Sequence, residues 1–149
     1  NVIRKFDYEV HTKASAALVW EVFSNWRRWQ SFSSVYGSLE WTQGEPWAPG
    51  SRLRIEIVRP VHTYIDHVIT YCEPGVKVGW IDNAFGIAIE QWVTFEPLAS
   101  GETRVRVVGE IAGGEFLNVA GKSAEFLLQQ FTETWYHNFS IVCDELAVS

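Results

Sequence analysis

The sequence lacks the features of membrane, secreted and nucleic-acid-binding proteins. No apolar run approaches the roughly 18 residues of a membrane-spanning helix, and residues 1–5 contain no apolar signal segment. The only two cysteines, Cys72 and Cys143, are far apart and do not suggest a disulfide framework. The net charge is -6, and the Lys and Arg residues do not cluster as a nucleic-acid surface requires. We therefore expect a cytoplasmic protein without stable membrane insertion and without a nucleic-acid partner.

Motifs of common enzyme classes are also missing. The chain contains no Gly-x-Ser-x-Gly and no Gly-x-Gly-x-x-Gly pattern. Residues 121–123 resemble the end of a phosphate-binding loop, but Phe116 occupies the position that needs glycine. His62 and His67 are five residues apart on a predicted strand, so they face opposite sides and do not share a metal ion. We expect neither a metal nor another cofactor.

Aromatic residues, in contrast, are abundant. They make up 15% of the chain, and eight of them are tryptophans. A chain of 149 residues is suited to one domain, 1–149, that buries roughly 68–70% of its unfolded surface. Indole rings fill space crudely, and each buried N–H needs a partner. The composition is therefore compatible both with a Trp-rich core and with an apolar cavity lined by rings.

The hydrophobic pattern predicts one strand, two short helices, six strands and a long helix. Residues 3–11 alternate between apolar and polar, as in a half-buried strand. Ser15 is suited to cap a short helix that ends near Phe23, and Ser24 or Asn25 can cap another turn or two. Turn signals then separate six predicted strands, at 35–42, 51–58, 61–71, 76–81, 86–96 and 103–111.

Residues 117–149 are predicted to form one long amphipathic helix. Such a helix needs a wide sheet to lie across, and the preceding strands are the only candidates. Phe126 and Tyr136 fall on its outer side, which is compatible with a sheet edge or with a homodimer contact. Its apolar stripe contains three large side chains, Leu127, Phe131 and Trp135. These should face the inward residues of the strands, Ile55, Ile57 and Ile89.

Three polar residues interrupt these apolar faces, namely His67, Gln91 and Asn138. A buried polar group costs about 1–3 kcal/mol unless a partner satisfies it. Each of the three is therefore either a core side chain bonded to a neighbour or a ligand contact in a cavity. For strand 61–71 we prefer the more apolar odd-numbered face inward, which includes His67. The reverse choice would turn Tyr64, Asp66 and His62 inward.

Two further expectations concern the strand register and the entrance. If Phe95 lies opposite Thr103, Trp92 lies opposite Arg106 on the outer face and makes a cation–π contact. Entrances to a cavity are expected at the irregular segments 113–116 and 32–36, with Phe116 as a gate.

Four motifs follow one another along the chain. They are Ala14-x-x-Ala17-x-Val19-Trp20-x-x-Phe23-Ser24-x-Trp26-x-x-Trp29, Gly50-Ser51, Glu73-Pro74 before a strand ending in Trp80, and Phe95-Glu96-Pro97 before Gly101-x-Thr103-Arg104-Val105. Their order resembles the START-like helix-grip superfamily (SRPBCC), in its polyketide cyclase/dehydrase and lipid-transport branch. The resemblance spans essentially the whole chain and implies an α+β helix-grip fold. In this fold a seven-stranded curved antiparallel sheet surrounds a long C-terminal helix, two short helices follow the first strand, and a hydrophobic cavity lies between sheet and helix.

The resemblance carries no catalytic residue, because members share the cavity and not an active-site motif. The leading hypothesis is binding of a small hydrophobic or amphipathic ligand, such as a lipid, a polyketide or another cyclic compound. The first alternative is an aromatase/cyclase-type enzyme acting on a poly-β-keto substrate. In that case His67 is the best candidate for the general acid or base, because histidine exchanges protons near neutral pH. The second alternative is a chaperone-associated interaction module without a ligand.

Overall fold

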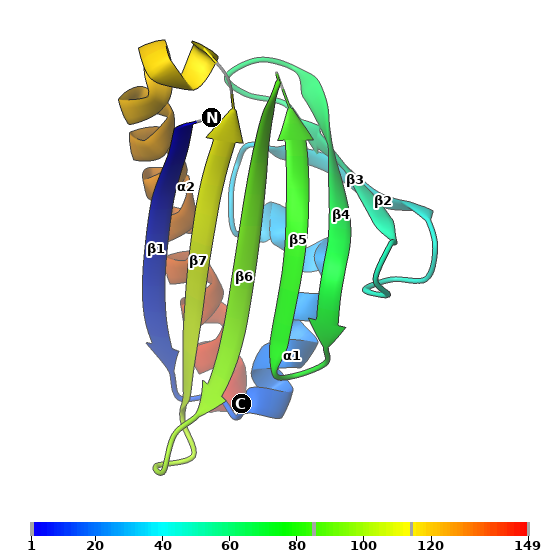
Figure 1. Ribbon diagram of the computed structural model, residues 1–149. Helices are drawn as coiled ribbons and strands as arrows, with labels where there is room; N and C mark the ends of the chain where they lie inside the picture. Colours follow the sequence, from blue (N-terminus) through cyan, green and yellow to red (C-terminus); the bar gives the residue numbers. More distant parts are fainter. Residues whose placement is uncertain (1, 85, 114, 149) are drawn as a thin grey trace.

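The computed structural model describes residues 2–84, 86–113 and 115–148, and of residues 2, 84 and 115–121 only the backbone. The strand β1 is followed by an α-helix, a 3-10 helix, six more strands and a long C-terminal helix (Figure 1). The elements are β1 (Val2–Thr12), α1 (Ala16–Ser24), η1 (Trp26–Ser31), β2 (Tyr36–Gln43), β3 (Arg52–Ile57), β4 (Thr63–Glu73), β5 (Lys77–Ala84), β6 (Ile87–Pro97), β7 (Thr103–Gly113) and α2 (Glu115–Ala147).

The seven strands form one antiparallel sheet in the order β1-β7-β6-β5-β4-β3-β2. β2 to β7 follow one another as a meander, because short turns can join only neighbouring antiparallel strands. β1 and β2 lie at opposite edges, so α1 and η1 carry the chain from one edge to the other. The prediction of an α+β helix-grip fold with seven strands is confirmed.

The two short helices begin at the polar residues that the sequence indicated. Ser15 Oγ accepts a hydrogen bond from the amide of Leu18 at 3.3 Å, and Asn25 Oδ1 accepts one from the amide of Arg27 at 3.3 Å. The second segment is a single 3-10 helix, η1. The Trp29 indole N–H fixes it to α1 by donating a hydrogen bond to the Phe23 carbonyl at 2.8 Å. Trp29 and Phe23 are thereby held inside the molecule.

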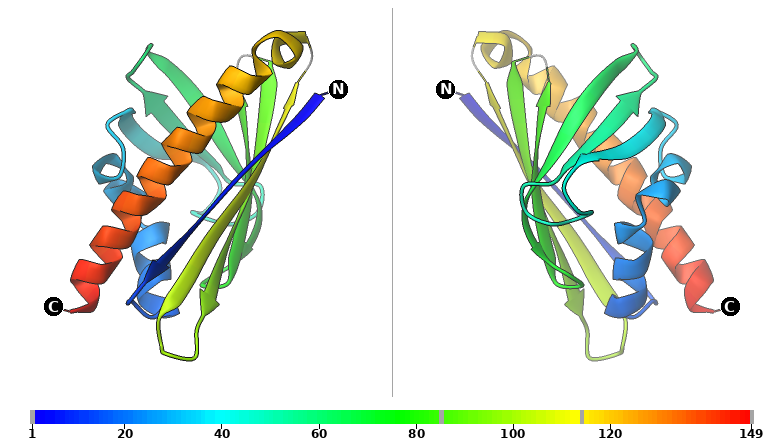
Figure 2. Two further views of the ribbon diagram at one scale, coloured as in Figure 1. Left: turned by 90° about the vertical axis from the view of Figure 1, so that its left-hand side faces the viewer. Right: turned by 90° about the vertical axis from the view of Figure 1, so that its right-hand side faces the viewer.

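The C-terminal helix α2 crosses the inner face of the sheet diagonally (Figure 2). At 1.5 Å per residue its 33 residues span roughly 50 Å. Asp144 anchors its last turns to the end of β1, because Oδ1 accepts bonds from Thr12 Oγ1 at 2.7 Å and from the Lys13 amide at 2.8 Å. α2 also contacts β7 and α1.

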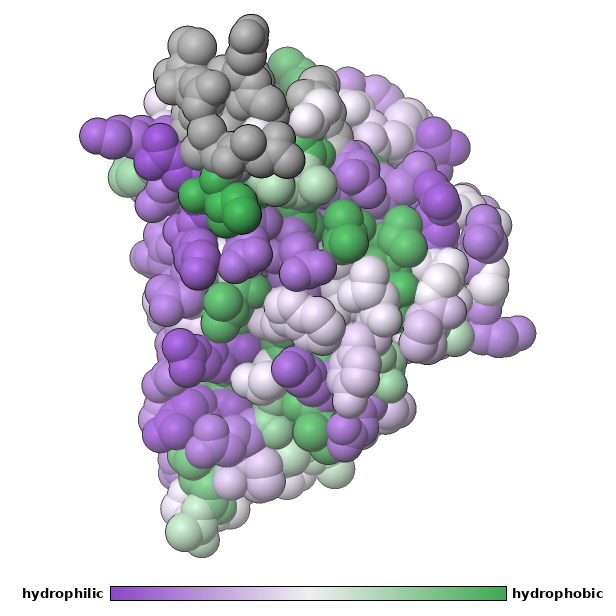
Figure 3. Space-filling view, viewed as in Figure 1, coloured by the Kyte–Doolittle hydropathy of each residue, from purple (hydrophilic) through white to green (hydrophobic). Residues whose placement is uncertain are grey.

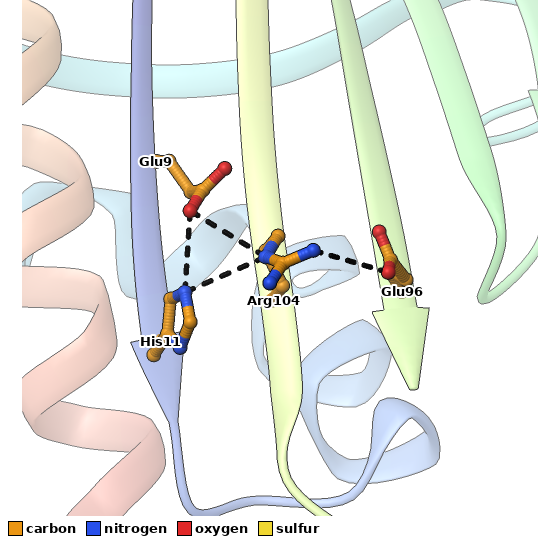
Figure 4. A network of polar contacts seen from close by, with 4 residues as sticks. All are labelled: Glu9, His11, Glu96 and Arg104. Atoms are coloured by element: carbon orange, nitrogen blue, oxygen red, sulfur yellow. Dashed lines mark hydrogen bonds and ion pairs between the residues drawn. The ribbon is translucent and has the colours of Figure 1, made fainter. Parts of the chain in front are cut away.

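The outer face of the sheet is mainly polar (Figure 3). At its β1 edge a network joins three neighbouring strands (Figure 4). The Arg104 guanidinium lies 3.4 Å from Glu9 Oε2 and 3.2 Å from Glu96 Oε1, and His11 Nε2 lies 3.2 Å from the same Glu9 oxygen. These contacts link β1, β7 and β6 on the side that faces solvent.

The predicted register of β6 and β7 is wrong by two residues. Phe95 lies opposite Val105 rather than Thr103, so Trp92 lies opposite Val108. The cation over the Trp92 ring is Lys77 on β5, with Nζ 4.8 Å from the ring centroid. The turn between the two strands decides the register, and its length could not be read from the alternation of apolar residues.

Buried apolar residues form two separate clusters. The larger one surrounds Phe23 and Trp29 and includes residues of α1, the central strands and the C-terminal half of α2. The smaller one consists of Phe6, Ile89 and Ile111, and Ile87, Ala124 and Leu128 pack against it. One continuous core would be usual for a domain of this size. The gap between the two clusters leads to the candidate site.

Candidate ligand-binding cavity

A cavity of about 400 Å³ lies between the inner face of the sheet and α2. Its walls contain residues of both apolar clusters, so the cavity is the space that separates them. The side chains that line it are Phe6, Phe23, Trp29, Val35, Tyr36, Ile55, Ile57, Arg59, Pro60, Ile65, His67, Trp80, Asp82, Ile89, Gln91, Leu127, Leu128, Phe131, Thr132, Trp135 and Tyr136.

Eight of the eleven predicted site residues are among these. The strands contribute Ile55, Ile57 and Ile89 from the inward face, and α2 contributes Leu127, Phe131 and Trp135. Leu127 is 63% exposed and lies at the rim, whereas Trp135 is buried at 4%. The other two are the polar residues His67 and Gln91, so strand β4 has its odd-numbered residues inward from Ile65 to Ile69, as preferred. A bulge after Ile69 then turns Tyr71 outward, where it is 40% exposed, so the prediction is wrong at that residue.

The polar part of the wall is a chain of hydrogen bonds across three adjacent strands. β4 and β5 pair so that His67 lies directly opposite Asp82, and His67 Nδ1 is 2.8 Å from Asp82 Oδ1. Gln91 on β6 is the diagonal neighbour of Asp82, and its Nε2 donates to Asp82 Oδ2 at 3.3 Å. Both carboxylate oxygens of Asp82 therefore have partners.

Two tryptophans hold the His67 ring in place. The Trp80 ring lies over it with centroids 4.6 Å apart, and the Trp29 ring meets it edge-on at 5.8 Å. The imidazole is 3% exposed, and its second nitrogen, Nε2, is buried without a hydrogen-bond partner. The indole nitrogen of Trp80 is likewise buried without a partner. Each such group costs about 1–3 kcal/mol of stability.

Tyr36 places a neutral hydroxyl beside this group. Burial, and then the negative charge of Asp82, raise the pKa of the Tyr36 phenol far above its ordinary value. The indole N–H of Trp135 lies close enough to that hydroxyl to oppose the shift slightly. Burial, and then Tyr36, also raise the pKa of Tyr136. Both phenols therefore stay protonated and can donate hydrogen bonds.

Two predicted site residues, Asn138 and Tyr64, do not line the cavity. Asn138 donates from Nδ2 to the Phe32 carbonyl at 3.0 Å and borders an open surface hollow between α2 and residues 30–35. Tyr64 is 48% exposed on the outer face, where the Arg54 guanidinium lies 4.5 Å from its ring centroid. The side chain of Phe116, the predicted gate, lies outside the described residues.

The sequence pattern missed the most important polar residue, Asp82. Asp82-Asn83 reads as a turn signal, so the predicted strand ended at residue 81, whereas β5 continues to Ala84. Tyr136 was also misplaced, since it is 5% exposed and lines the cavity instead of facing outward. The signal that could have revealed Asp82 is a pairing of strands 61–71 and 76–84 that places His67 opposite Asp82.

Other kinds of site find no support in the described part of the chain. No three His, Cys, Asp or Glu side chains there lie together as a metal site requires. None of the helices described combines the length and apolarity that a membrane span needs.

Comparison with known families agrees with this geometry. Residues 4–134 match the model of the family described as polyketide cyclase / dehydrase and lipid transport. The chain belongs to this family. Family membership indicates a hydrophobic ligand, without showing which one. No curated protein matches the chain in sequence.

Solved structures of other proteins share the fold at low sequence identity. A START superfamily protein from Mycobacterium smegmatis is 14% identical with a TM-score of 0.78, over 95% of this chain and 98% of that one. Ara h 8.0201 is 12% identical with a TM-score of 0.76, over 95% and 98%. A Thalictrum norcoclaurine synthase point mutant in complex with a transition state analogue is 16% identical with a TM-score of 0.73, over 97% and 96%.

Proposed function

We propose that the protein binds a small hydrophobic or amphipathic compound in the cavity between the sheet and α2. The observation that carries this proposal is the cavity of about 400 Å³ between two apolar clusters. Ligand sites have volumes of about 300–1,000 Å³. The lining of the cavity is mostly apolar with a few polar side chains, as is usual for ligand sites, and the exposed Leu127 at its rim marks a way in.

The ring-lined walls favour a cyclic compound over a simple acyl chain. Phe131 from α2 and the three tryptophans Trp29, Trp80 and Trp135 line the space. Pairs of aromatic rings gain about 0.5–1.5 kcal/mol beyond the area they bury, which a flexible alkyl chain does not obtain. A polyketide or another cyclic compound with one or two oxygen atoms suits this wall. The oxygen atoms would bond to Tyr36 and to the chain of His67, Asp82 and Gln91.

The cavity also counts against an interaction module that works without a ligand. Such a module would gain stability from a filled core, because lining atoms that face a void lose their dispersion contacts. The described structure instead leaves two polar nitrogens unsatisfied on residues that line the space, His67 and Trp80.

Fluorescence titration with prodan, a neutral naphthalene ketone whose emission depends on polarity, tests this proposal. The wild-type protein should bind prodan with a shift of its emission to shorter wavelength. Ile55→Trp and Phe131→Trp fill the cavity and should weaken binding at least about tenfold, a loss of roughly 1.4 kcal/mol. Ile141→Trp is the matched control, because Ile141 is 41% exposed on α2 and lines no part of the cavity.

Two results would contradict the proposal. One is the absence of prodan binding to the wild-type protein, and the other is equal affinity in the filled variants. Circular dichroism and thermal melting of each variant show whether it is folded. Because Phe131 is only half-buried, its variant keeps the test usable if Ile55→Trp does not fold.

A further inference from the structure

A second, open hollow adjoins the cavity. Its volume is about 580 Å³, and three residues, Val35, Leu127 and Phe131, line both spaces. The Phe131 ring is fixed at this boundary by an edge-on contact with Tyr36, with centroids 6.0 Å apart. Leu127 is exposed at the common rim. A ligand that extends from the cavity past Leu127 therefore enters the hollow.

One wall of the hollow is a polar stripe of α2. Gln130, Thr134 and Asn138 are four residues apart, so they lie one above the other on the helix. The neighbouring stripe contains Leu127 and Phe131, which are apolar and also border the cavity. α2 therefore presents apolar side chains to the cavity and uncharged polar side chains to the hollow.

The opposite wall is formed by residues 30–35, which include three serines, Ser31, Ser33 and Ser34. Asn138 joins the two walls, because its Nδ2 donates to the Phe32 carbonyl at 3.0 Å. This bond leaves Asn138 Oδ1 available to accept. Ser33 Oγ accepts a hydrogen bond from the amide of Val35 at 3.4 Å, so its own hydroxyl proton remains available to a ligand.

Other polar side chains of the hollow have no protein partner. Within the part of the chain that the structure describes, the side chains of Gln130, Thr134 and Ser34 make no hydrogen bond. Hydroxyl and amide groups both donate and accept hydrogen bonds, as the hydroxyl groups of a ligand do. Charged residues make up 20% of the chain, yet none of the eleven described residues that line the hollow is charged. The hollow therefore matches uncharged hydroxyl groups better than an ionic group.

We propose that the hollow binds an uncharged, polyhydroxylated substituent of the ligand, such as a glycosyl group, while the ring system of the same ligand lies in the cavity. This inference rests on the proposed function, because the ring system must first bind in the cavity. In the hollow, serine, threonine, asparagine and glutamine side chains replace the water around the hydroxyl groups. Each such bond is modest because water competes for the same groups, but several together select the substituted compound.

Two naphthalene compounds that differ in this substituent test the inference. 2-Naphthyl β-D-glucopyranoside carries a sugar on its ether oxygen, and 2-methoxynaphthalene carries a methyl group there. Displacement of prodan from the protein measures the dissociation constant of each compound. Thr134→Trp fills the hollow and should weaken binding of the glucoside at least about tenfold, whereas the dissociation constant of 2-methoxynaphthalene should stay within about twofold.

A matched control and a smaller substitution complete the experiment. Ile141→Trp places the same side chain on α2 at a residue that lines neither space, and it should bind both compounds like the wild type. Thr134→Val keeps the shape of the side chain and removes its hydroxyl, so it should weaken binding of the glucoside alone, by about threefold. Thr134 is exposed, so both replacements at this residue leave the core intact.

The outcomes separate this inference from the proposed function. A glucoside that fails to bind the wild-type protein, or that binds wild type and Thr134→Trp equally, overturns the hollow as a subsite and leaves binding in the cavity intact. Equal loss of both compounds in Thr134→Trp also overturns it, because the residue would then act on the cavity itself. Absence of prodan binding to the wild-type protein overturns both proposals.

Discussion

We expect the His67–Asp82 pair to reduce the stability of the fold relative to an apolar pair, because burial of a charged or polar pair costs more desolvation energy than the contact returns. The pair lies on the wall of an apolar cavity, with His67 3% and Asp82 13% exposed. Removing one partner leaves the buried polar group of the other without its hydrogen bond. Asp82→Ala should therefore lower the free energy of unfolding by about 2–4 kcal/mol, since it deletes a charge-assisted bond of about 1.5–3 kcal/mol and strands His67 Nδ1.

Replacement of both residues should change the free energy of unfolding in the opposite direction from the single replacement. The double variant His67→Leu with Asp82→Leu removes the buried charge and also the unsatisfied Nε2, which by itself costs about 1–3 kcal/mol. Apolar replacements of buried pairs are often neutral or stabilising by about 1–4 kcal/mol. The double variant should therefore be at least as stable as the wild type, and at least about 2 kcal/mol more stable than Asp82→Ala.

Urea unfolding followed by far-ultraviolet circular dichroism measures these differences, with His67→Leu alone completing the double-mutant cycle. A double variant less stable than Asp82→Ala would refute the reasoning. The pair would then be a structural element of the sheet, and its place beside the cavity would carry no functional meaning.

Three further outcomes are expected. A Cβ at Gly109 would overlap the Phe6 ring, so Gly109→Ala should push this ring into the cavity and weaken prodan binding in a titration, with the circular dichroism spectrum unchanged. Arg104→Ala should lower the free energy of unfolding by at most about 1 kcal/mol, and high salt should abolish the difference. Burial, and then Asp144, raise the pKa of the Cys143 thiol to about 12, and burial raises that of Tyr36. Both groups stay protonated in the native state and ionise in the unfolded state, so the midpoint of urea unfolding should fall from about pH 9 upward. The fall should be less steep in Tyr36→Phe. A midpoint that stays constant to about pH 11 would contradict this.

The order and type of the elements follow from local patterns in the sequence. Alternation with a period of two and the turn signals between segments predicted the strands, and the 3.6-residue period predicted the helix at 117–149, which the structure has at Glu115–Ala147. The inward direction of Ile55, Ile57 and Ile89 follows from the same alternation, because successive side chains of a strand point to opposite faces.

The site itself depended on contacts between elements that are distant in sequence. Asp82 became visible only when the pairing of β4 and β5 placed it opposite His67, and no local signal fixes such a register. Tyr136 is buried because β1, β7 and α1 together cover α2, whereas a single apolar stripe predicts cover on one side alone. Asn138, at the centre of that stripe, bonds instead to the Phe32 carbonyl at the end of η1.

The sequence by itself therefore determined the order of strands and helices and the apolar faces that meet inside the fold, since these arise from periodicity and turn signals along the chain. Only the tertiary structure decided that the two apolar clusters do not meet. Trp29 of η1 packs against Trp135 of α2 at 5.5 Å and against His67 of β4 at 5.8 Å, so it lies between the helix and the sheet. The cavity exists because this packing leaves a space.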